Sequence, residues 1–274
     1  MIEESEQEET KSVSEDMTFF DQPEILQFVF YPRRDFAPLP SVPNITVHSI
    51  PVEEGIFISC RFYSDGERAP NILFFHGNGE IASDYDDIGL LYTQLGINFF
   101  VADYRGYGHS NGRPTISNMM RDAPPIFKGF KQTLQERGYS GSLFLMGRSL
   151  GSASAVELAY HYQDQIKGLI IESGFSDIAG LLTNLGIPMR SPGPSRMSLL
   201  SNLERVRSIS IPTLVIHAEY DFLIPLQHGK DLYQNSAAQD KQLLIIPNAT
   251  HNDIFLVDID RYLKAVKEFV SVHS

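Results

Sequence analysis

Residues 143–151 read Leu-Phe-Leu-Met-Gly-Arg-Ser-Leu-Gly, and this stretch decides the fold. Its first four residues are typical of a buried strand, and a helix-like segment follows over residues 152–163. Ser149 therefore stands at the apex of a sharp strand-to-helix turn, with Gly147 and Gly151 on either side. Such a turn exposes a serine hydroxyl for attack on a carbonyl, and glycines are needed because the turn leaves no room for a Cβ. The stretch therefore predicts Ser149 as a nucleophile.

Two polar residues further along the chain are candidates for activating this serine. Asp221 follows the strand-like run 213–217, and His251 follows the apolar run 243–246. Both are therefore expected at the C-terminal ends of strands, the edge where catalytic groups gather in open α/β sheets. A serine hydroxyl needs a base, histidine titrates near neutral pH, and an acid orients the histidine. Glu219 is the alternative to Asp221 as that acid.

A second glycine-rich turn follows the apolar run 72–75, where residues 76–79 read His-Gly-Asn-Gly. Backbone N–H groups at such a turn can point at a developing oxyanion. The N–H of Asn78 and that of Leu150, which follows the serine, are the best pair. Gly79 replaces Asn78 if the loop is shifted by one residue, and a plain glycine turn is the alternative to an oxyanion hole.

Taken together, these motifs resemble those of the α/β-hydrolases, and within that superfamily those of the Bem46-like and ABHD-type serine hydrolases. The resemblance implies a mostly parallel central sheet flanked by helices, and catalytic residues in the order Ser, Asp, His. Asp221 holds the aspartate position of the resembling pattern that starts at His217, which favours it over Glu219. The matching stretches are 73–79, 103–110, 147–151, 217–225 and 251–253.

Hydrophobic periodicity independently predicts an α/β fold. Alternating apolar residues indicate two antiparallel strands, and the unbroken apolar runs that follow indicate strands buried on both faces of a parallel sheet. Helix-like segments fall between most of the strands, which is the pattern of a doubly wound sheet. The expected strands are 45–48, 56–62, 72–75, 99–102, 143–146, 169–171, 213–216 and 243–246, and the expected helices include 83–95, 117–137, 152–163 and 258–272.

One connection is irregular, because residues 176–211 contain three prolines and little periodicity. The resembling enzymes place there the cap that covers the active site, and this length predicts a small lid of one or two helices. An ordinary surface crossover is the alternative. The predicted apolar lining is Leu181, Leu182, Leu185, Ile187 and Met189.

Composition restricts the class of protein. The 274 residues suffice for one large domain, and a net charge of −12 argues against nucleic-acid binding. Residues 1–20 carry seven acidic residues and one lysine, which predicts a disordered acidic tail before a hydrolase domain over 21–274. This tail lacks the features of a signal peptide, and no run reaches the roughly 18 apolar residues of a membrane span. Cys60, the single cysteine, is expected in a strand, and its isolation favours a reducing, cytoplasmic setting.

The remaining motifs indicate neither a metal nor a cofactor. No H-x-H or H-E-x-x-H spacing occurs, and the glycines of 106–112 form no dinucleotide or phosphate loop. Tyr104 and Arg105 are expected to brace their loop rather than bind substrate. We therefore predict a serine hydrolase that cleaves small-molecule carboxylic esters or thioesters through an acyl-enzyme. The alternatives are a depalmitoylase-like acyl-protein thioesterase, which the resemblance implies, and a catalytically silent α/β-hydrolase scaffold.

Overall fold

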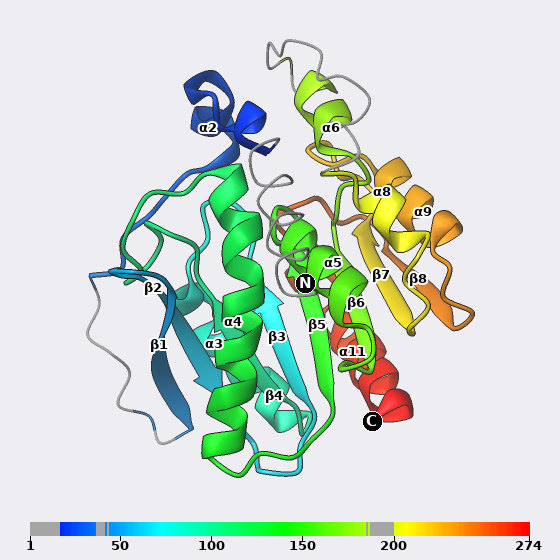
Figure 1. Cartoon of the computed structure of the whole chain (residues 1–274). Helices are drawn as coiled ribbons and strands as arrows, with labels where there is room; N and C mark the ends of the chain where they lie inside the picture. Colours follow the sequence, from blue (N-terminus) through cyan, green and yellow to red (C-terminus); the bar gives the residue numbers. More distant parts are fainter. Residues whose placement is uncertain (1–16, 37–41, 43, 185, 187–199) are drawn as a thin grey trace, which may run out of the picture.

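An eight-stranded sheet forms the centre of the molecule in the computed structural model, which describes residues 17–36, 42, 44–184, 186 and 200–274 (Figure 1). The strand order is β1-β2-β4-β3-β5-β6-β7-β8. β2 pairs antiparallel with β1 and with β4, whereas the other neighbours are parallel. The predicted fold class is therefore confirmed. The strands are β1 (Ile45–Glu53), β2 (Ile56–Tyr63), β3 (Asn71–Phe75), β4 (Asn98–Ala102), β5 (Leu143–Arg148), β6 (Gly168–Glu172), β7 (Thr213–Ala218) and β8 (Lys241–Ile246).

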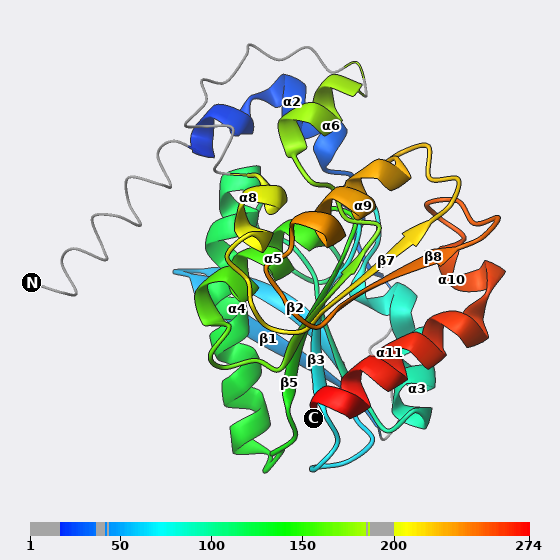
Figure 2. The same cartoon turned by 90° about the vertical axis from the view of Figure 1, so that its right-hand side faces the viewer.

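Helices cover both faces of the sheet, which explains the unbroken apolar runs of its strands. In β3, Leu73 and Phe75 belong to one apolar core, and Ile72 and Phe74 belong to the other. α4 and α5 cover the first face, and α3 and α11 cover the second (Figure 2). The helices are η1 (Thr18–Asp21), α2 (Pro23–Val29), η2 (Ala82–Tyr85), α3 (Asp86–Gln94), α4 (Ile116–Glu136), α5 (Gly151–Tyr162), α6 (Ile178–Asn184), α8 (Asn202–Val206), α9 (Leu226–Asn235), α10 (Ile254–Val257) and α11 (Ile259–His273).

The N-terminal end of the described chain corrects one prediction. Residues 1–16 of the predicted acidic tail lie outside the described residues, but Met17 and Phe20 are buried in the core. Asp21, at the end of η1, accepts a hydrogen bond of 3.1 Å from the backbone N–H of Ser117 at the start of α4. The predicted tail is therefore too long by four residues, because apolar side chains that lack local periodicity still pack against a distant helix.

The irregular connection 176–211 is described in part. It contains α6 and α8, and both Leu181 and Leu182 contact the apolar core. α6 lies above the edge at which the parallel strands end (Figure 2). The other predicted lining residues, Leu185, Ile187 and Met189, lie outside the described residues, so the lid stays a prediction.

A search of the described ranges for a helix long and apolar enough to cross a bilayer finds none. Cys60 is fully buried in β2, as expected for a strand side chain.

Candidate active site

The turn between β5 and α5 has the strained backbone that its sequence predicts. Ser149 has a φ of 51°, in the left-handed region that non-glycine residues rarely adopt. Its backbone N–H donates to the carbonyl of Glu172 at 2.9 Å, and its carbonyl accepts from the Ser152 hydroxyl at 2.6 Å. Such a conformation costs about 1–3 kcal/mol and persists only where the surroundings hold it. The end of β6 and the first turn of α5 supply that support.

The two glycines of the turn are required because other backbone atoms approach their Cα atoms too closely for a Cβ. A Cβ on Gly151 would lie far inside van der Waals contact with the carbonyl oxygen of Phe75, at the end of β3. A Cβ on Gly147 would meet the carbonyl oxygen of Gly151 in the same way. The turn therefore packs backbone against backbone, which only glycine permits.

The structure brings the three predicted residues into one hydrogen-bonded chain. His251 Nε2 lies 3.0 Å from the Ser149 hydroxyl oxygen, and His251 Nδ1 lies 2.7 Å from Asp221 Oδ2. All three residues are buried, and they come from the ends of β5, β7 and β8, which meet at one edge of the sheet. The backbone N–H groups of Leu223 and Ile224 hold the Asp221 carboxylate beside His251.

Asp221 is held as a carboxylate. Burial disfavours its charge, but the hydrogen bond and charge of His251 and the backbone N–H of Ile224 lower the pKa of Asp221 below its ordinary value. The Oδ1 atom accepts from the N–H groups of Leu223 (3.0 Å) and Ile224 (2.7 Å). Because a carboxylate only accepts, His251 Nδ1 carries the proton and Nε2 presents its lone pair to Ser149.

The competing acid lies elsewhere. Glu219 accepts a hydrogen bond of 2.9 Å from the backbone N–H of Asn248 and orders the start of the loop that carries the histidine. Asp253, just before α10, accepts from the Thr250 N–H at 2.6 Å, and its side chain caps no N–H of α10. Asp221 is thus the acid that contacts His251.

The two predicted oxyanion donors lie in the loop after β3 and at the start of α5. The Asn78 side chain is anchored, because its Oδ1 accepts from the Tyr31 N–H (2.7 Å) and from the Tyr107 hydroxyl (2.8 Å). Within the described residues, no group accepts a hydrogen bond from the backbone N–H of Asn78 or of Leu150. Their role as oxyanion donors stays a prediction.

Sequence reasoning missed a buried ion cluster beneath this site. Arg148, the residue before the serine, donates from Nε to Glu172 Oε1 (3.1 Å) and from Nη2 to the backbone carbonyl of His251 (2.8 Å). Its Nη1 bonds Glu80. The available signal was three charged residues at or just after the ends of apolar strands, positions where a charge must find a partner.

The charges of this cluster depend on one another. Burial disfavours the charge of Arg148, but the carboxylates of Glu80 and Glu172 raise its pKa above the ordinary value, so it stays a cation. Burial raises the pKa of Glu172, against the opposing effect of Arg148. Removing the guanidinium would leave two carboxylates facing each other with little solvent.

Two other histidines at strand ends make structural contacts. His217 donates from Nε2 to the carbonyl of Ile224 at 2.8 Å, and burial lowers its pKa, so it is neutral. His76 Nε2 lies 3.2 Å from Asp103 Oδ1. Both brace loops beside the site.

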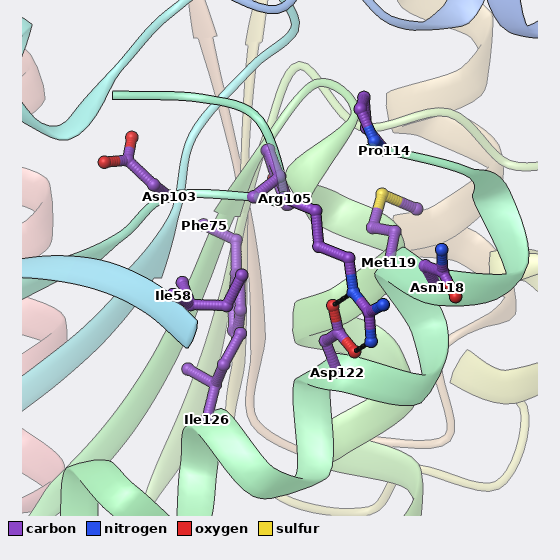
Figure 3. A pocket seen from close by; sticks show the side chains of 10 residues that line it. Ile58, Phe75, Asp103, Arg105, Pro114, Asn118, Met119, Asp122 and Ile126 are labelled. Atoms are coloured by element: carbon purple, nitrogen blue, oxygen red, sulfur yellow. Dashed lines mark hydrogen bonds and ion pairs between the residues drawn. The ribbon is translucent and has the colours of Figure 1, made fainter. Parts of the chain in front are cut away.

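The loop after β4 also has the predicted bracing role. The Arg105 guanidinium makes a two-point ion pair with Asp122 of α4, at 2.6 and 2.7 Å (Figure 3). The Tyr104 hydroxyl donates to the carbonyl of His76 at 2.6 Å. The cavity between these groups measures about 10 Å³, enough for no more than one water.

The fold and the geometry of this site define an α/β-hydrolase. A model of the hydrolase family described as "Serine aminopeptidase, S33" matches residues 66–189 and 197–255, and the chain belongs to this family. The predicted resemblance to ABHD-type proteins is also confirmed. Human alpha/beta hydrolase domain-containing protein 17B is 27% identical over 226 residues, which cover 80% of this chain and 72% of the relative. Alpha/beta hydrolase domain-containing protein WAV2 of Arabidopsis thaliana is 28% identical over 222 residues, which cover 76% of this chain and 71% of the relative.

Solved structures share the fold at low sequence identity. An esterase of Pyrococcus furiosus superposes with a TM-score of 0.71 at 17% identity, over 88% of this chain and 98% of that one. Est1E of Butyrivibrio proteoclasticus, solved with ferulic acid, has a TM-score of 0.69 at 19% identity, over 82% and 98% of the two chains. These likenesses establish the architecture.

Proposed function

We propose that this hydrolase cleaves carboxylic esters or thioesters through an acyl-enzyme formed on Ser149. The observation that carries the proposal is the unbroken chain of hydrogen bonds from the Ser149 hydroxyl through His251 to Asp221, at 3.0 and 2.7 Å. Nucleophile, base and acid in this order are what acyl transfer requires.

The proposed reaction follows from these positions. His251 Nε2 takes the proton of the Ser149 hydroxyl as its oxygen attacks the acyl carbonyl, and the Asp221 carboxylate stabilises the imidazolium that forms. The N–H groups of Asn78 and Leu150 hold the oxyanion, and each such donor is worth roughly 10²–10³ in rate. His251 then gives its proton to the departing alcohol or thiol. Water, activated by the same histidine, releases the acid and restores Ser149.

Proteins of similar structure support the choice of ester or thioester substrates. The structural neighbours include the esterase of Pyrococcus furiosus and a monoacylglycerol lipase of Paleococcus ferrophilus. The family description names an aminopeptidase, so an amide bond is the rival to test. A depalmitoylase-like thioesterase and a silent scaffold are two further rivals.

Graded substrates separate these possibilities. Purified protein is assayed with p-nitrophenyl esters from acetate to palmitate, acyl-CoA thioesters of matched length and aminoacyl p-nitroanilides. Each buried methylene gains about 0.8 kcal/mol, roughly fourfold in kcat/KM, until the apolar lining ends. We expect short to medium acyl chains to be preferred, because a short connection such as 176–211 can shade a pocket but not build a deep tunnel.

Three results would revise the proposal in distinct ways. A kcat/KM that still rises at palmitate would favour the acyl-protein thioesterase. Turnover of anilides alone would indicate a peptidase. No turnover of any substrate, together with no labelling of Ser149 by a fluorophosphonate probe, would leave the scaffold.

The glycine after the nucleophile offers a separate test of the turn. Gly151→Ala should lower kcat about 10²-fold, because the turn must move away from the Phe75 carbonyl and carries Ser149 with it. Overpacking of this kind also costs about 1–3 kcal/mol of unfolding free energy. The measurement is kcat for a short ester alongside urea unfolding.

The matched control is Gly66→Ala. A Cβ at Gly66 meets nothing within 4 Å, so both quantities should stay near wild type, with stability within about 0.5 kcal/mol. An active Gly151→Ala protein would mean that the turn tolerates displacement and that its close packing is not needed for activity.

A further inference from the structure

We propose that Arg148 is a positioning residue: its guanidinium fixes the position of the loop that carries His251 relative to the turn that carries Ser149. The inference rests on the proposed function and adds to it a residue that contacts neither substrate nor reacting atoms. Its basis is the set of three contacts that one buried side chain makes.

Those contacts join three separate segments. From the last position of β5, Arg148 reaches the backbone carbonyl of His251 after β8 (2.8 Å), the carboxylate of Glu172 at the end of β6 (3.1 Å) and the carboxylate of Glu80 after β3. The planar guanidinium has donors spread over a fixed fork, which suits three acceptors in different directions. A lysine ammonium is a single point and cannot reproduce that spread.

The carboxylates are themselves fixed, so the cluster has little freedom to shift. Glu172 Oε2 accepts from the Tyr262 hydroxyl of α11 at 2.6 Å. Glu80 Oε2 accepts from the Tyr85 hydroxyl and from the Gly77 backbone N–H, both at 2.7 Å. Gly77 precedes the predicted oxyanion donor Asn78. The cluster therefore connects the turn that carries Ser149, the loop that carries His251 and the loop that carries Asn78.

The hydrogen bond from Arg148 to the His251 carbonyl gives Arg148 a role beyond stabilising the fold. A buried ion pair can often be replaced by apolar side chains with little loss of stability. Here, however, one donor goes to the peptide carbonyl of His251 itself, so its removal frees the residue whose Nε2 must stay 3.0 Å from the Ser149 hydroxyl. Misplacing a reacting group by about 1 Å can cost roughly 10² in rate.

A neighbouring cavity provides an unusual way to test this role. It measures about 230 Å³ and lies between η2–α3 and α10, with Arg148 and both carboxylates in its wall. Asn252, next to His251, also lines it. If Arg148 is truncated to alanine, a free guanidinium ion can enter through this cavity and occupy the place of the lost side chain.

The decisive experiment compares kcat and KM for a p-nitrophenyl ester in wild type, Arg148→Met and Arg148→Lys. We expect kcat of Arg148→Met to fall about 10²-fold with KM within about twofold, and Arg148→Lys to lose less. Guanidinium chloride at non-denaturing concentration should raise kcat of Arg148→Ala at least severalfold, whereas equal sodium chloride or urea should not. Wild-type kcat in folded Arg148→Met, or no rescue of folded Arg148→Ala, would overturn the proposal.

The control for a purely structural effect is Arg61→Met, which removes another buried ion pair, that of Arg61 in β2 with Asp35 (2.9 Å). It should lower the unfolding midpoint and leave kcat unchanged; an equal fall of kcat in both variants would overturn the proposal. If Arg148→Met does not fold, the double variant Arg148→Met/Glu172→Gln removes a stranded buried charge. It should still show the loss of kcat, and wild-type kcat there would count against positioning.

A measurement that does not depend on catalysis tests this inference separately from the proposed function. Hydrogen exchange of residues 247–253 should be faster in Arg148→Met than in wild type, relative to the sheet, and unchanged exchange would overturn the positioning role. If wild type shows no Ser149-dependent hydrolysis, the proposed function fails, while the exchange measurement still decides whether Arg148 holds the His251 loop.

Discussion

Ser149→Ala and His251→Ala are each expected to lower kcat by about 10⁶, the largest effects that any single substitution in this chain should produce. The serine supplies the attacking oxygen, and the histidine, 3.0 Å away, must take its proton and return it to the leaving group. The two act as a unit, so the double variant should be no worse than either single one. Steady-state rates with a p-nitrophenyl ester measure the loss, and a fluorophosphonate probe should label wild type but not Ser149→Ala.

The chain offers close controls for both substitutions. Ser154 lies in the first turn of α5 and is buried. Its hydroxyl has no partner among the described residues, so Ser154→Ala should keep full activity. His161, half exposed at the end of the same helix, serves the same purpose for the histidine. Equal probe labelling of wild type and Ser149→Ala would refute the assigned nucleophile.

Asp221→Asn should reduce kcat by about 10⁴ while the fold stays intact. The asparagine oxygen can still accept from the N–H groups of Leu223 and Ile224, so the turn keeps its hydrogen bonds. Its amide nitrogen then faces His251 Nδ1 and donates to it, which moves the imidazole proton to Nε2. In that tautomer the histidine can no longer accept the proton of Ser149.

The comparison variant for this substitution is Glu219→Gln, which should leave kcat near wild type, because Glu219 contacts the Asn248 N–H and not the histidine. Circular dichroism of both variants checks that folding is preserved. A collapse of Glu219→Gln beside a nearly active Asp221→Asn would assign the acid role to Glu219.

Local patterns in the sequence were enough to predict the fold and to mark the candidate site residues, but the choice of Asp221 over Glu219 needed the resemblance to known hydrolases. Each parallel strand is an unbroken apolar run, and its burial on both faces follows from that pattern. Ser149, Asp221 and His251 could be picked because each comes directly after such a run, and strand ends meet at one edge. The structure brings them within hydrogen-bonding distance, and their catalytic roles stay predictions.

The parts that sequence reasoning missed depend on contacts between remote positions. Arg148 bonds residues 24, 68 and 103 positions away, and no local period encodes such a cluster. The end of the predicted tail fails for the same reason, because Phe20 is buried by packing with helices far along the chain. Charge and periodicity describe a residue's neighbours in sequence, whereas burial depends on its neighbours in space.

The pairing of β2 with β4 has a consequence for where this protein can be cut. The family match begins at residue 66, after β1, β2 and the segment that holds the Asn78 side chain through Tyr31. A fragment trimmed to that limit would expose the full edge of β4, whose five residues are all buried in the intact chain. An apolar strand edge of this kind recruits other chains. The stretch that holds the candidate site residues is therefore shorter than the stretch that covers the edge of β4.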